Sequence, residues 1–424
     1  MRTQVQVPSE GHVLPADFWL DGSGRSEIGV STLARTQKVA HICSNYLPLT
    51  ETFIYSFLKN MRTYEPFVLA NTMMNVNLFP LQQIVSIPQA PAAERVINKI
   101  VRMVGVCPST QYGYYKNILT KERAGLIHAH FGPTGFKAME LSKGLKLPLV
   151  TSFYGVDLSR LPRKWYWRKA YQRLFVAGTY FLTFSKKMRS MLIDLGCPQE
   201  KVESCPAGVD IEEFPFRPRA LGEGEEIRIL LCNRLVEKKG TEYAVRAFAM
   251  LKPRVPRCRL TIIGDGPLNG ELQSLVSRLK LGPFVEFLGM QPHQRVINEL
   301  LKAHIFLSPS VLARDGDDEG GINYVVVEAA ATGMPLVVTE HASSEIVFNG
   351  LSGLIAKDRD EIDLFEKLLF LVENRSIWEK LGSNARNVVE SQFSAVTQTQ
   401  KLEEIYTGLI SRMPGETALR TGAR

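Results

Sequence analysis

Two basic side chains directly follow an apolar run near the middle of the sequence. In the segment IRILLCNRLVEKKG, Arg234 and Lys239 come just after residues typical of a buried strand. If that strand belongs to a parallel sheet, both lie at its carboxyl edge, where such sheets bind ligands. Arg234 offers a planar fork of donors and Lys239 a point charge, so together they could neutralise a departing diphosphate in place of a metal ion. Lys238 is expected to be an exposed basic residue.

A pair of glycines precedes a second apolar segment, EGGINYVVVEAAATGMP. Asn323 is a plausible N-cap, and the pattern predicts a helix over residues 324–332. Gly320, Gly321 and Ile322 then lie just before a helix N-terminus, where free N–H groups and the helix dipole favour a phosphate. The alternative is a buried strand-helix unit preceded by a solvated acidic loop.

Apolar strand-like runs alternate with amphipathic segments from Val39 onward, which predicts parallel sheets covered on both faces. The alternation weakens at PFRPRALGEGEE, which has the composition of a linker, and then restarts. We therefore expect a flexible extension (1–37), two doubly wound domains (38–218 and 219–393), and a C-terminal helix with a frayed tail (394–424).

The composition is that of a soluble globular protein, with 45% hydrophobic and 22% charged residues. No apolar run is long enough for a membrane helix, and the first residues lack the apolar core of a signal peptide, so a cytoplasmic protein is expected. The net charge of +8 indicates an anionic partner. Nucleic acid is disfavoured as that partner because the basic residues are spread out and no recognition module is present.

Several motifs in order resemble glycosyltransferase family 4. They are PLTETFI, HAHFGPTG, SFYGVD and FSKKM with PAGVD in the first half, then NRLVEKKG, IIGDGP, EGGINYVVVEAAATGMP and SSEIVFNGLSGLI in the second, so the similarity runs from about Val39 to Phe393. The resemblance implies an α/β protein of GT-B type, with two Rossmann-like domains whose parallel sheets face each other across a cleft. It also implies a retaining transferase that takes a sugar from a nucleotide diphosphate donor and needs neither a cofactor nor a bound metal.

The resemblance assigns the donor to the second domain. Glu328 would hold the ribose of the nucleotide and Glu319 the hydroxyls of the transferred sugar. Seven residues usually separate these two glutamates in the family, but eight separate them here, so Gly320 stands at the expected first position. The base is expected to meet the backbone after the strand VEFLG, at Gly289, Met290 and Gln291.

The acceptor side is assigned to the first domain, at His130, Tyr154 and Asp157, with Glu51 a weaker candidate. His128 and His130 point to the same face of a strand, and His130 is nearer its carboxyl end. A structural histidine is the alternative. The family often has His where Tyr154 stands, and a tyrosine with a pKa of about 10 is a poor proton shuttle near neutral pH. The leaving phosphate could take the acceptor's proton itself.

Other functions remain open from the residues alone. IIGDGPLNG suggests a dinucleotide site, but Asn269 stands where a third glycine is required, so an NAD-dependent oxidoreductase is a weak alternative. Asp315, Asp317 and Asp318 resemble the acidic metal motif of the other major glycosyltransferase fold, although a solvated loop is favoured. A nucleotide-sugar epimerase, or an inactive nucleotide-sugar-binding protein, would keep the fold without transfer.

One segment, RLPRKWYWRKAYQRLF, mixes basic and aromatic residues at positions 160–175. Aromatic rings sit at headgroup depth and basic residues meet lipid phosphates, which indicates peripheral contact with an anionic membrane at its inner face. The alternative is a surface helix whose aromatics pack on the sheet. The resemblance to the family implies that the acceptor is a lipid-linked or growing glycan in polysaccharide biosynthesis, and this segment supports the lipid-linked form.

Overall fold

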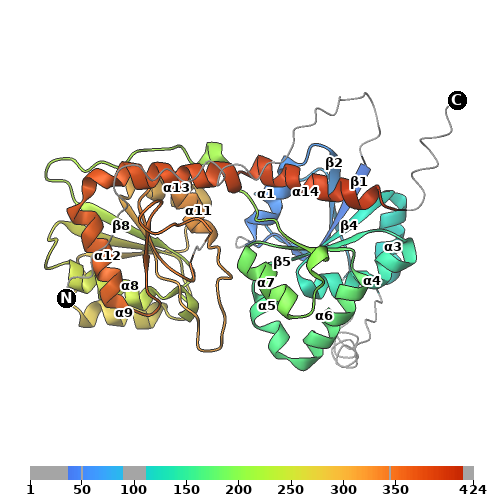
Figure 1. Ribbon diagram of the computed structural model, residues 1–424, viewed down its shortest axis with the longest axis horizontal. Helices are drawn as coiled ribbons and strands as arrows, with labels where there is room; N and C mark the ends of the chain where they lie inside the picture. The colour runs from blue at the N-terminus through green and yellow to red at the C-terminus, as the bar shows by residue number, and fades with distance from the viewer. Residues whose placement is uncertain (1–36, 49–50, 89–110, 343–344, 414–424) are drawn as a thin grey trace. The chain divides into compact units, whose positions relative to one another are not determined.

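The computed structural model describes residues 37–48, 51–88, 111–342 and 345–413. They form two compact units: an N-terminal unit of residues 37–208 and 395–413, and a C-terminal unit of residues 209–394. Each unit carries one sheet with helices packed on it (Figure 1). The predicted extension and tail lie almost wholly outside the described residues. That the two sheets face each other across a cleft remains a prediction.

The N-terminal unit is built on a seven-stranded sheet in the order β3-β2-β1-β4-β5-β6-β7. All neighbouring strands are parallel. The strands are β1 Gln37–Tyr46, β2 Tyr64–Met73, β3 Ile84–Ser86, β4 Ala124–His130, β5 Leu149–Phe153, β6 Tyr180–Thr183 and β7 Val202–Ser204. The main helices are α1 Thr52–Asn60, α3 Tyr112–Lys121, α4 Gly132–Leu145, α5 Val156–Ser159, α6 Trp165–Ala177, α7 Lys186–Asp194 and α14 Ala395–Ile410.

The C-terminal unit repeats this arrangement with a six-stranded parallel sheet in the order β10-β9-β8-β11-β12-β13. Its strands are β8 Ile227–Cys232, β9 Cys258–Ile263, β10 Val285–Gly289, β11 Ile305–Ser308, β12 Leu336–Thr339 and β13 Leu354–Ala356. Its helices are α8 Thr241–Leu251, α9 Asn269–Arg278, α10 His293–Lys302, α11 Tyr324–Ala331, α12 Glu361–Glu373 and α13 Trp378–Gln392. Short 3-10 turns occupy Leu161–Arg163 and Gln199–Lys201 in the N-terminal unit, and Ile211–Glu213, Glu237–Lys239 and Arg375–Ile377 in the C-terminal unit.

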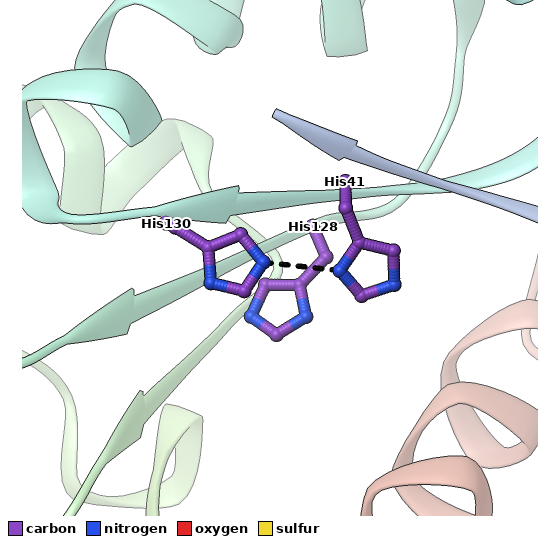
Figure 2. Close-up of side chains that lie close together, drawn as sticks. All are labelled: His41, His128 and His130. Atoms are coloured by element: carbon purple, nitrogen blue, oxygen red, sulfur yellow. Dashed lines mark hydrogen bonds between the residues drawn. The ribbon is translucent and has the colours of Figure 1, made fainter. Parts of the chain in front are cut away.

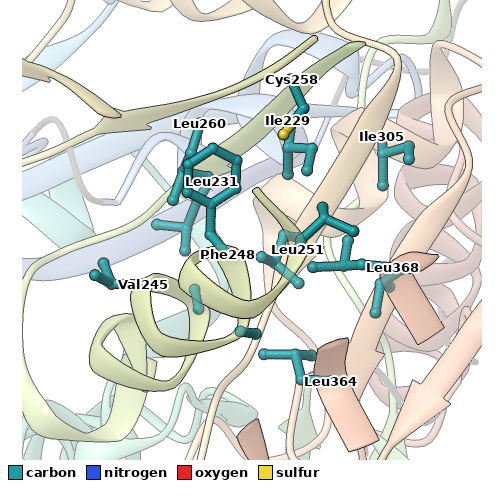
Figure 3. Packing of buried hydrophobic residues seen from close by; sticks show 14 of the residues in the cluster. Ile229, Leu231, Val245, Phe248, Leu251, Cys258, Leu260, Ile305, Leu364 and Leu368 are labelled. Carbon is teal, nitrogen blue, oxygen red and sulfur yellow. The ribbon is translucent and has the colours of Figure 1, made fainter. Parts of the chain in front are cut away.

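The C-terminal sheet is buried on both faces because its strands are apolar at successive positions. Ile229 and Leu231 of β8 point to one face, where they pack with α8, α9 and α12 (Figure 3). Leu230 points to the other face, into a second core formed with α10, α11 and α13. Near-continuous apolar strands of this kind are expected of a parallel sheet between two helical layers. The predicted fold class is confirmed.

The boundary between the units lies earlier than predicted, at residues 208/209 instead of 218/219. Val209 donates its N–H to the Phe393 carbonyl at 2.8 Å, and Phe214 is buried in the core of the C-terminal unit. The C-terminal helix α14 is likewise no separate element, because it belongs to the N-terminal unit, where it packs against α1 and β4.

The segment expected to be a linker is anchored by a buried arginine. Arg219 is 6% exposed and donates to the carbonyls of Leu300 and Ala303, each at 2.8 Å. It also donates to the Thr332 carbonyl at 3.2 Å and to the Thr332 hydroxyl at 3.0 Å. Arg219 thus satisfies carbonyls at the ends of α10 and α11, which an intrahelical bond cannot reach. A Pro- and Gly-rich composition did not make this segment a free linker.

Candidate functional site

The candidate donor site lies where the strand order of the C-terminal sheet reverses. β8 has β9 on one side and β11 on the other, and ligands of doubly wound sheets bind at such a point, beyond the carboxyl ends of the strands. Lys239 follows β8 and Glu319 follows β11. Their side chains meet, with Lys239 Nζ 2.7 Å from Glu319 Oε2. Lys239, one of the two basic residues predicted to bind the diphosphate, therefore lies beside the loop that carries Gly320.

Glu319 is held by two lysines. Its second oxygen, Oε1, lies 3.4 Å from Lys238 Nζ, and the Lys239 side chain is only 9% exposed. Burial by itself would raise the pKa of Glu319, but the charges of Lys239 and Lys238 outweigh it and hold that pKa below its ordinary value. Glu319 is therefore an anion that pairs with both lysines.

The start of α11 has the predicted features of an anion site except for its cap. Gly320 and Gly321 have φ angles of 71° and 95°, which a side chain would strain. Asn323 occupies the N-cap position, but its side chain donates to Ser308 Oγ at 3.1 Å instead of accepting from the helix. Glu328 lies one turn into α11 and is partly exposed. Burial raises the pKa of Glu328 to about 7.

The other predicted donor residues lie at the same edge of the sheet. Arg234 follows β8 and is exposed, and its charge is close enough to disfavour a proton on Lys239. Gly289 ends β10 with a φ of 66°, and its carbonyl accepts from Gly264 N, after β9, at 2.8 Å. Met290 is 59% exposed and Gln291 donates to the Leu288 carbonyl.

Two expectations about charged residues near this site were wrong. Lys238 is not an exposed basic residue, because its side chain is 11% exposed and pairs with Asp317 at 3.3 Å. Asp318 is not part of a solvated loop, because it is 7% exposed and lies 3.2 Å from His341 Nδ1. Both errors have one cause. The acidic loop folds back onto the basic residues after β8, so side chains of opposite charge pair and shield each other from solvent.

The acceptor-side residues gather at the corresponding point of the N-terminal sheet, after β4 and β5. Tyr154 directly follows β5, is partly exposed, and packs against three phenylalanines. Its ring centroid is 4.9 Å from that of Phe53, 4.8 Å from Phe131 and 4.5 Å from Phe184. Phe131 has a φ of 72°, a backbone conformation that is strained for a bulky residue. Strained conformations of this kind are concentrated at functional sites. The result is an aromatic surface with a hydroxyl in it.

The buried side chain of Asp157 holds the backbone that carries this surface. It is 1% exposed, and its carboxylate accepts backbone N–H groups from Tyr154 and Gly155 at one oxygen and from Gly132 at the other, at 2.9 to 3.0 Å. It therefore joins the end of β5 to the start of α4. Glu51 lies before α1, is partly exposed, and has its pKa raised to about 7 by burial.

His130 is behind Tyr154 and not at the surface. It is fully buried, with Nδ1 2.5 Å from the Tyr154 hydroxyl and Nε2 3.0 Å from His41 Nδ1. Sequence reasoning missed His41. Because β1 and β4 are neighbours at the reversal of a doubly wound sheet, a histidine in the first strand could have been matched with the pair in the fourth.

Comparison with known proteins agrees with this architecture. Residues 96–213 match the family described as Glycosyltransferase Family 4, and residues 213–388 match the family described as Glycosyl transferases group 1. The amylovoran biosynthesis glycosyltransferase AmsK of Erwinia amylovora is 35% identical over 286 residues, which are 66% of this chain and 70% of AmsK. The putative colanic acid biosynthesis glycosyltransferase WcaL of Escherichia coli K12 is 32% identical, over 69% of this chain and 72% of WcaL.

Solved structures share the fold at lower identity. HepE of Anabaena, in complex with UDP, has a TM-score of 0.73 at 17% identity, covering 88% of this chain and all of HepE, 100%. Sucrose-phosphate synthase of Thermosynechococcus elongatus has a TM-score of 0.69 at 16% identity, covering 88% of this chain and 99% of the synthase. With two doubly wound parallel sheets, both family matches and relatives of this identity, the chain belongs to glycosyltransferase family 4 and is a glycosyltransferase of GT-B fold.

Proposed function

We propose that this glycosyltransferase moves a sugar, with retention of configuration, from a nucleotide diphosphate donor to a glycan acceptor in exopolysaccharide biosynthesis. The observation that carries the proposal is the contact between Lys239 and Glu319 beside the glycine-led start of α11. The names of AmsK and WcaL support the exopolysaccharide role, and HepE, which was solved with UDP and with UDP-glucose, supports the donor class.

The leaving diphosphate is the main electrostatic problem of this reaction. Arg234 and Lys239 would neutralise it, and the N–H groups of Gly320, Gly321 and Ile322 would add fixed donors from the helix start. A diphosphate that takes Lys239 would release Glu319, whose oxygens could then accept hydrogen bonds from the hydroxyls of the transferred sugar. The contact of Lys239 with Glu319 would thus be replaced by contacts of both residues with the nucleotide-sugar donor.

The nucleoside would lie along the same sheet edge. Glu328, with a pKa near neutrality, is suited to hold the ribose hydroxyls in either protonation state. Gly289, Met290 and Gln291, after β10, would meet the base. Because two cations and the helix start supply the positive charge, we propose that the chemistry is independent of a metal ion.

The acceptor would lie on the aromatic surface of the N-terminal unit. Sugars present apolar ring faces as well as hydroxyls, and the rings of Tyr154, Phe53 and Phe131 offer both kinds of contact. Asp157 would hold the loop that carries Tyr154, and Glu51 is a further candidate beside α1. The proton of the attacking hydroxyl would pass to the leaving phosphate, so no strong protein base is needed.

A lipid-linked acceptor would bring the protein to a membrane surface. In the described part of the chain, no helix is both long and apolar enough to span a bilayer. Trp165, at the start of α6, is 57% exposed with Lys169 Nζ 5.1 Å from its ring, whereas Trp167 is buried. Trp165 and the basic residues around it support peripheral contact with anionic lipid. Sedimentation with phosphatidylglycerol vesicles, compared between wild type and Trp165→Ala, tests this.

The donor assignment can be tested by screening nucleotide sugars for a rise in melting temperature, followed by transfer assays on the one that binds. We expect one nucleotide sugar to stabilise the protein, because it binds the folded state only. Arg234→Ala should lower turnover roughly a hundredfold, the effect of removing one oxyanion donor. Arg246→Ala, an exposed arginine on α8, is the matched control.

Three outcomes would contradict the proposal: no stabilising nucleotide sugar, near-normal turnover in Arg234→Ala, or an inverted anomeric configuration in the first product seen by NMR. Activity that disappears with EDTA and returns with a divalent metal would contradict metal independence.

A further inference from the structure

Three histidines form a buried cluster where the strand order of the N-terminal sheet reverses. His41 lies on β1, and His128 and His130 lie on β4, all on one face of the sheet (Figure 2). Each is at most 1% exposed, and one ring nitrogen of each lies within 4.8 Å of the others. Burial lowers the pKa of His130 to about 3 and those of His41 and His128 well below the ordinary value, so the rings are neutral.

The hydrogen bonds of His128 stay within the core. Its Nδ1 lies 2.5 Å from the Tyr406 hydroxyl and its Nε2 lies 2.7 Å from the Ser152 hydroxyl. Tyr406 is 0% exposed and Ser152 is 4% exposed. Because both nitrogens are in use and the ring is stacked on that of His130, with centroids 4.5 Å apart, His128 is poorly placed to share a metal ion with the other two histidines.

The hydrogen bonds of His130 form a row that reaches the surface, made of Tyr154, His130 and His41. His130 Nδ1 lies 2.5 Å from the Tyr154 hydroxyl, and His130 Nε2 lies 3.0 Å from His41 Nδ1. The ring planes of Tyr154 and His130 differ by 12°, and those of His130 and His41 by 23°. Tyr154 is partly exposed, whereas both histidines are fully buried. The two histidines therefore support the hydroxyl of Tyr154 from inside the unit.

The row leaves the Tyr154 hydroxyl able to bind one more group, whichever way its protons point. A neutral imidazole has one N–H and one lone pair, so His130 either donates to Tyr154 and accepts from His41 or does the reverse. In the first case Tyr154 keeps its proton to donate, and in the second it keeps a lone pair to accept. A sugar hydroxyl can both donate and accept, so it fits Tyr154 in either case.

Stability alone does not account for the two histidines of the row. His41 Nε2 is buried and has no hydrogen-bond partner among the described residues. A buried polar atom without a partner costs free energy, which an apolar side chain of similar size would avoid. A local cost of this kind is expected at a functional site.

We propose that His130, held in turn by His41, fixes the Tyr154 hydroxyl in place, so that it recognises one hydroxyl group of the acceptor sugar. This inference rests on the proposed function, which places the acceptor at Tyr154. Tyr154 contacts the acceptor, whereas His130 and His41 are positioning residues, because neither is exposed. The recognised hydroxyl is a different one from the reacting hydroxyl, whose proton goes to the leaving phosphate.

Deoxy sugars test the recognition. Methyl glycosides of common hexoses serve as probe acceptors, and each one that is used is compared with analogues in which one hydroxyl at a time is replaced by hydrogen. For one hydroxyl other than the reacting one, the replacement should lower kcat/KM roughly tenfold in wild type and have no effect in Tyr154→Phe. A loss that persists in Tyr154→Phe, the absence of such a hydroxyl, or failure of every methyl hexoside as an acceptor would overturn the proposal.

A double-mutant cycle tests whether His130 acts through Tyr154. Tyr154→Phe and His130→Leu should each raise KM for the acceptor several-fold, and the double variant should be no worse than Tyr154→Phe alone. KM for the nucleotide-sugar donor should not change. His130→Asn should restore much of the wild-type KM, because its amide can take the place of Nδ1. Effects of the two changes that add in the double variant would show that His130 does not act through Tyr154.

Two further variants separate positioning from stability. His41→Leu should raise KM for the acceptor less than His130→Leu does, because His41 is one step further from Tyr154. Tyr406→Phe is the matched control, since it removes an equally buried hydrogen bond, the one to His128, and leaves the row intact. A rise in acceptor KM for Tyr406→Phe equal to that for His130→Leu would mean that KM follows stability, and the positioning role would be wrong.

A spectroscopic measurement checks the row without any acceptor. In full-length protein labelled with ¹⁵N-histidine, Tyr154→Phe should shift the ring signals of His130 more than those of His128. Unshifted His130 signals, or a larger shift for His128, would contradict the row. A shift of all three histidines on addition of Zn²⁺ would show a metal site in its place. This measurement also decides the question if His130→Leu does not fold, because Tyr154→Phe changes only a partly exposed hydroxyl.

The outcomes separate this inference from the proposed function. If the histidine signals respond as expected but no nucleotide sugar is used, the proposed function fails, and the recognition role fails with it although the row exists. If transfer occurs but acceptor KM does not respond to Tyr154→Phe and His130→Leu, this inference fails and the proposed function stands.

Discussion

Lys239 and Glu319 form a buried ion pair, 2.7 Å apart, across the reversal of strand order in the C-terminal sheet. Each comes from the loop after a different strand, so the pair joins β8 to the loop before α11. The same two residues are proposed to contact the donor. A catalytic cation that is already paired costs less to keep buried than a free one, but the donor must displace its partner.

A double-mutant cycle measures this pair. Glu319→Gln should lower the free energy of unfolding by about 3 kcal/mol, because it leaves the buried charge of Lys239 without its partner. Lys239→Met should cost less, because Glu319 still pairs with Lys238. The double variant should be less destabilised than the two effects added, since neither charge remains. Urea unfolding at neutral pH gives the four stabilities. Additive losses would show that the two charges do not interact.

Glu328→Gln tests the carboxyl group of α11 whose pKa lies near neutral pH. Its pKa is raised to about 7 in the folded state from an ordinary 4.5, so folding favours the protonated form and stability falls as the pH rises from about 4.5 to 7. Glutamine cannot ionise. The variant should therefore be more stable than wild type at pH 8 and equal to it at pH 4, as measured by thermal melting.

The same change should weaken binding of the nucleotide-sugar donor. Glutamine still offers a hydrogen bond to ribose, but one that is weaker than the bond made by the ionised carboxylate, so at pH 8 the KM for the nucleotide sugar should rise up to roughly tenfold. Unchanged donor KM, with the expected change in stability, would mean that Glu328 is near the site but does not contact the nucleotide.

The buried histidines predict a loss of stability in mild acid. His41, His128 and His130 have an ordinary pKa of 6.5 and a folded pKa far below it. Below pH 6.5 the unfolded chain takes up protons that the folded protein cannot, so stability is complete above pH 6.5 and is lost as the pH falls. Each ring contributes a slope of up to about 1.4 kcal/mol per pH unit.

Urea unfolding at pH 8, 6 and 5 checks this slope. His128→Asn should be less stable than wild type at pH 8 but should lose less stability between pH 6 and 5, because one titrating ring is gone. Parallel curves for the two proteins would mean that His128 is not held neutral.

Glu403 attaches the C-terminal helix to the N-terminal unit. From α14 its Oε1 accepts the backbone N–H groups of Arg62, Thr63 and Tyr64 at 2.6 to 3.1 Å. Glu403→Ala leaves these donors unsatisfied and should cost about 2 kcal/mol or more in unfolding free energy. Glu404→Ala, exposed on the same helix, should change little. Equal effects of the two changes would show that the carboxylate of Glu403 is not the anchor.

What the sequence alone determined is local. The alternation of apolar strands and amphipathic segments predicted two parallel sheets. The spacing of apolar residues within a short stretch of sequence shows which faces of a helix or strand are buried. With Asn323 as N-cap, the sequence predicted a helix over residues 324–332, and α11 spans Tyr324–Ala331, one residue less at its end. These features depend on backbone conformation and periodicity within about a dozen residues.

Only the tertiary structure decided which side chains meet. Lys238 is mostly covered and Asp318 is buried, because the loop after β11 folds onto the loop after β8. Arg219 anchors a segment whose composition suggested a linker. His41 reaches His130 because β1 and β4 are neighbours, although 89 positions separate the two residues. Composition cannot reveal such pairs, because charge pairing and burial depend on strand order, which is set by packing across the whole unit.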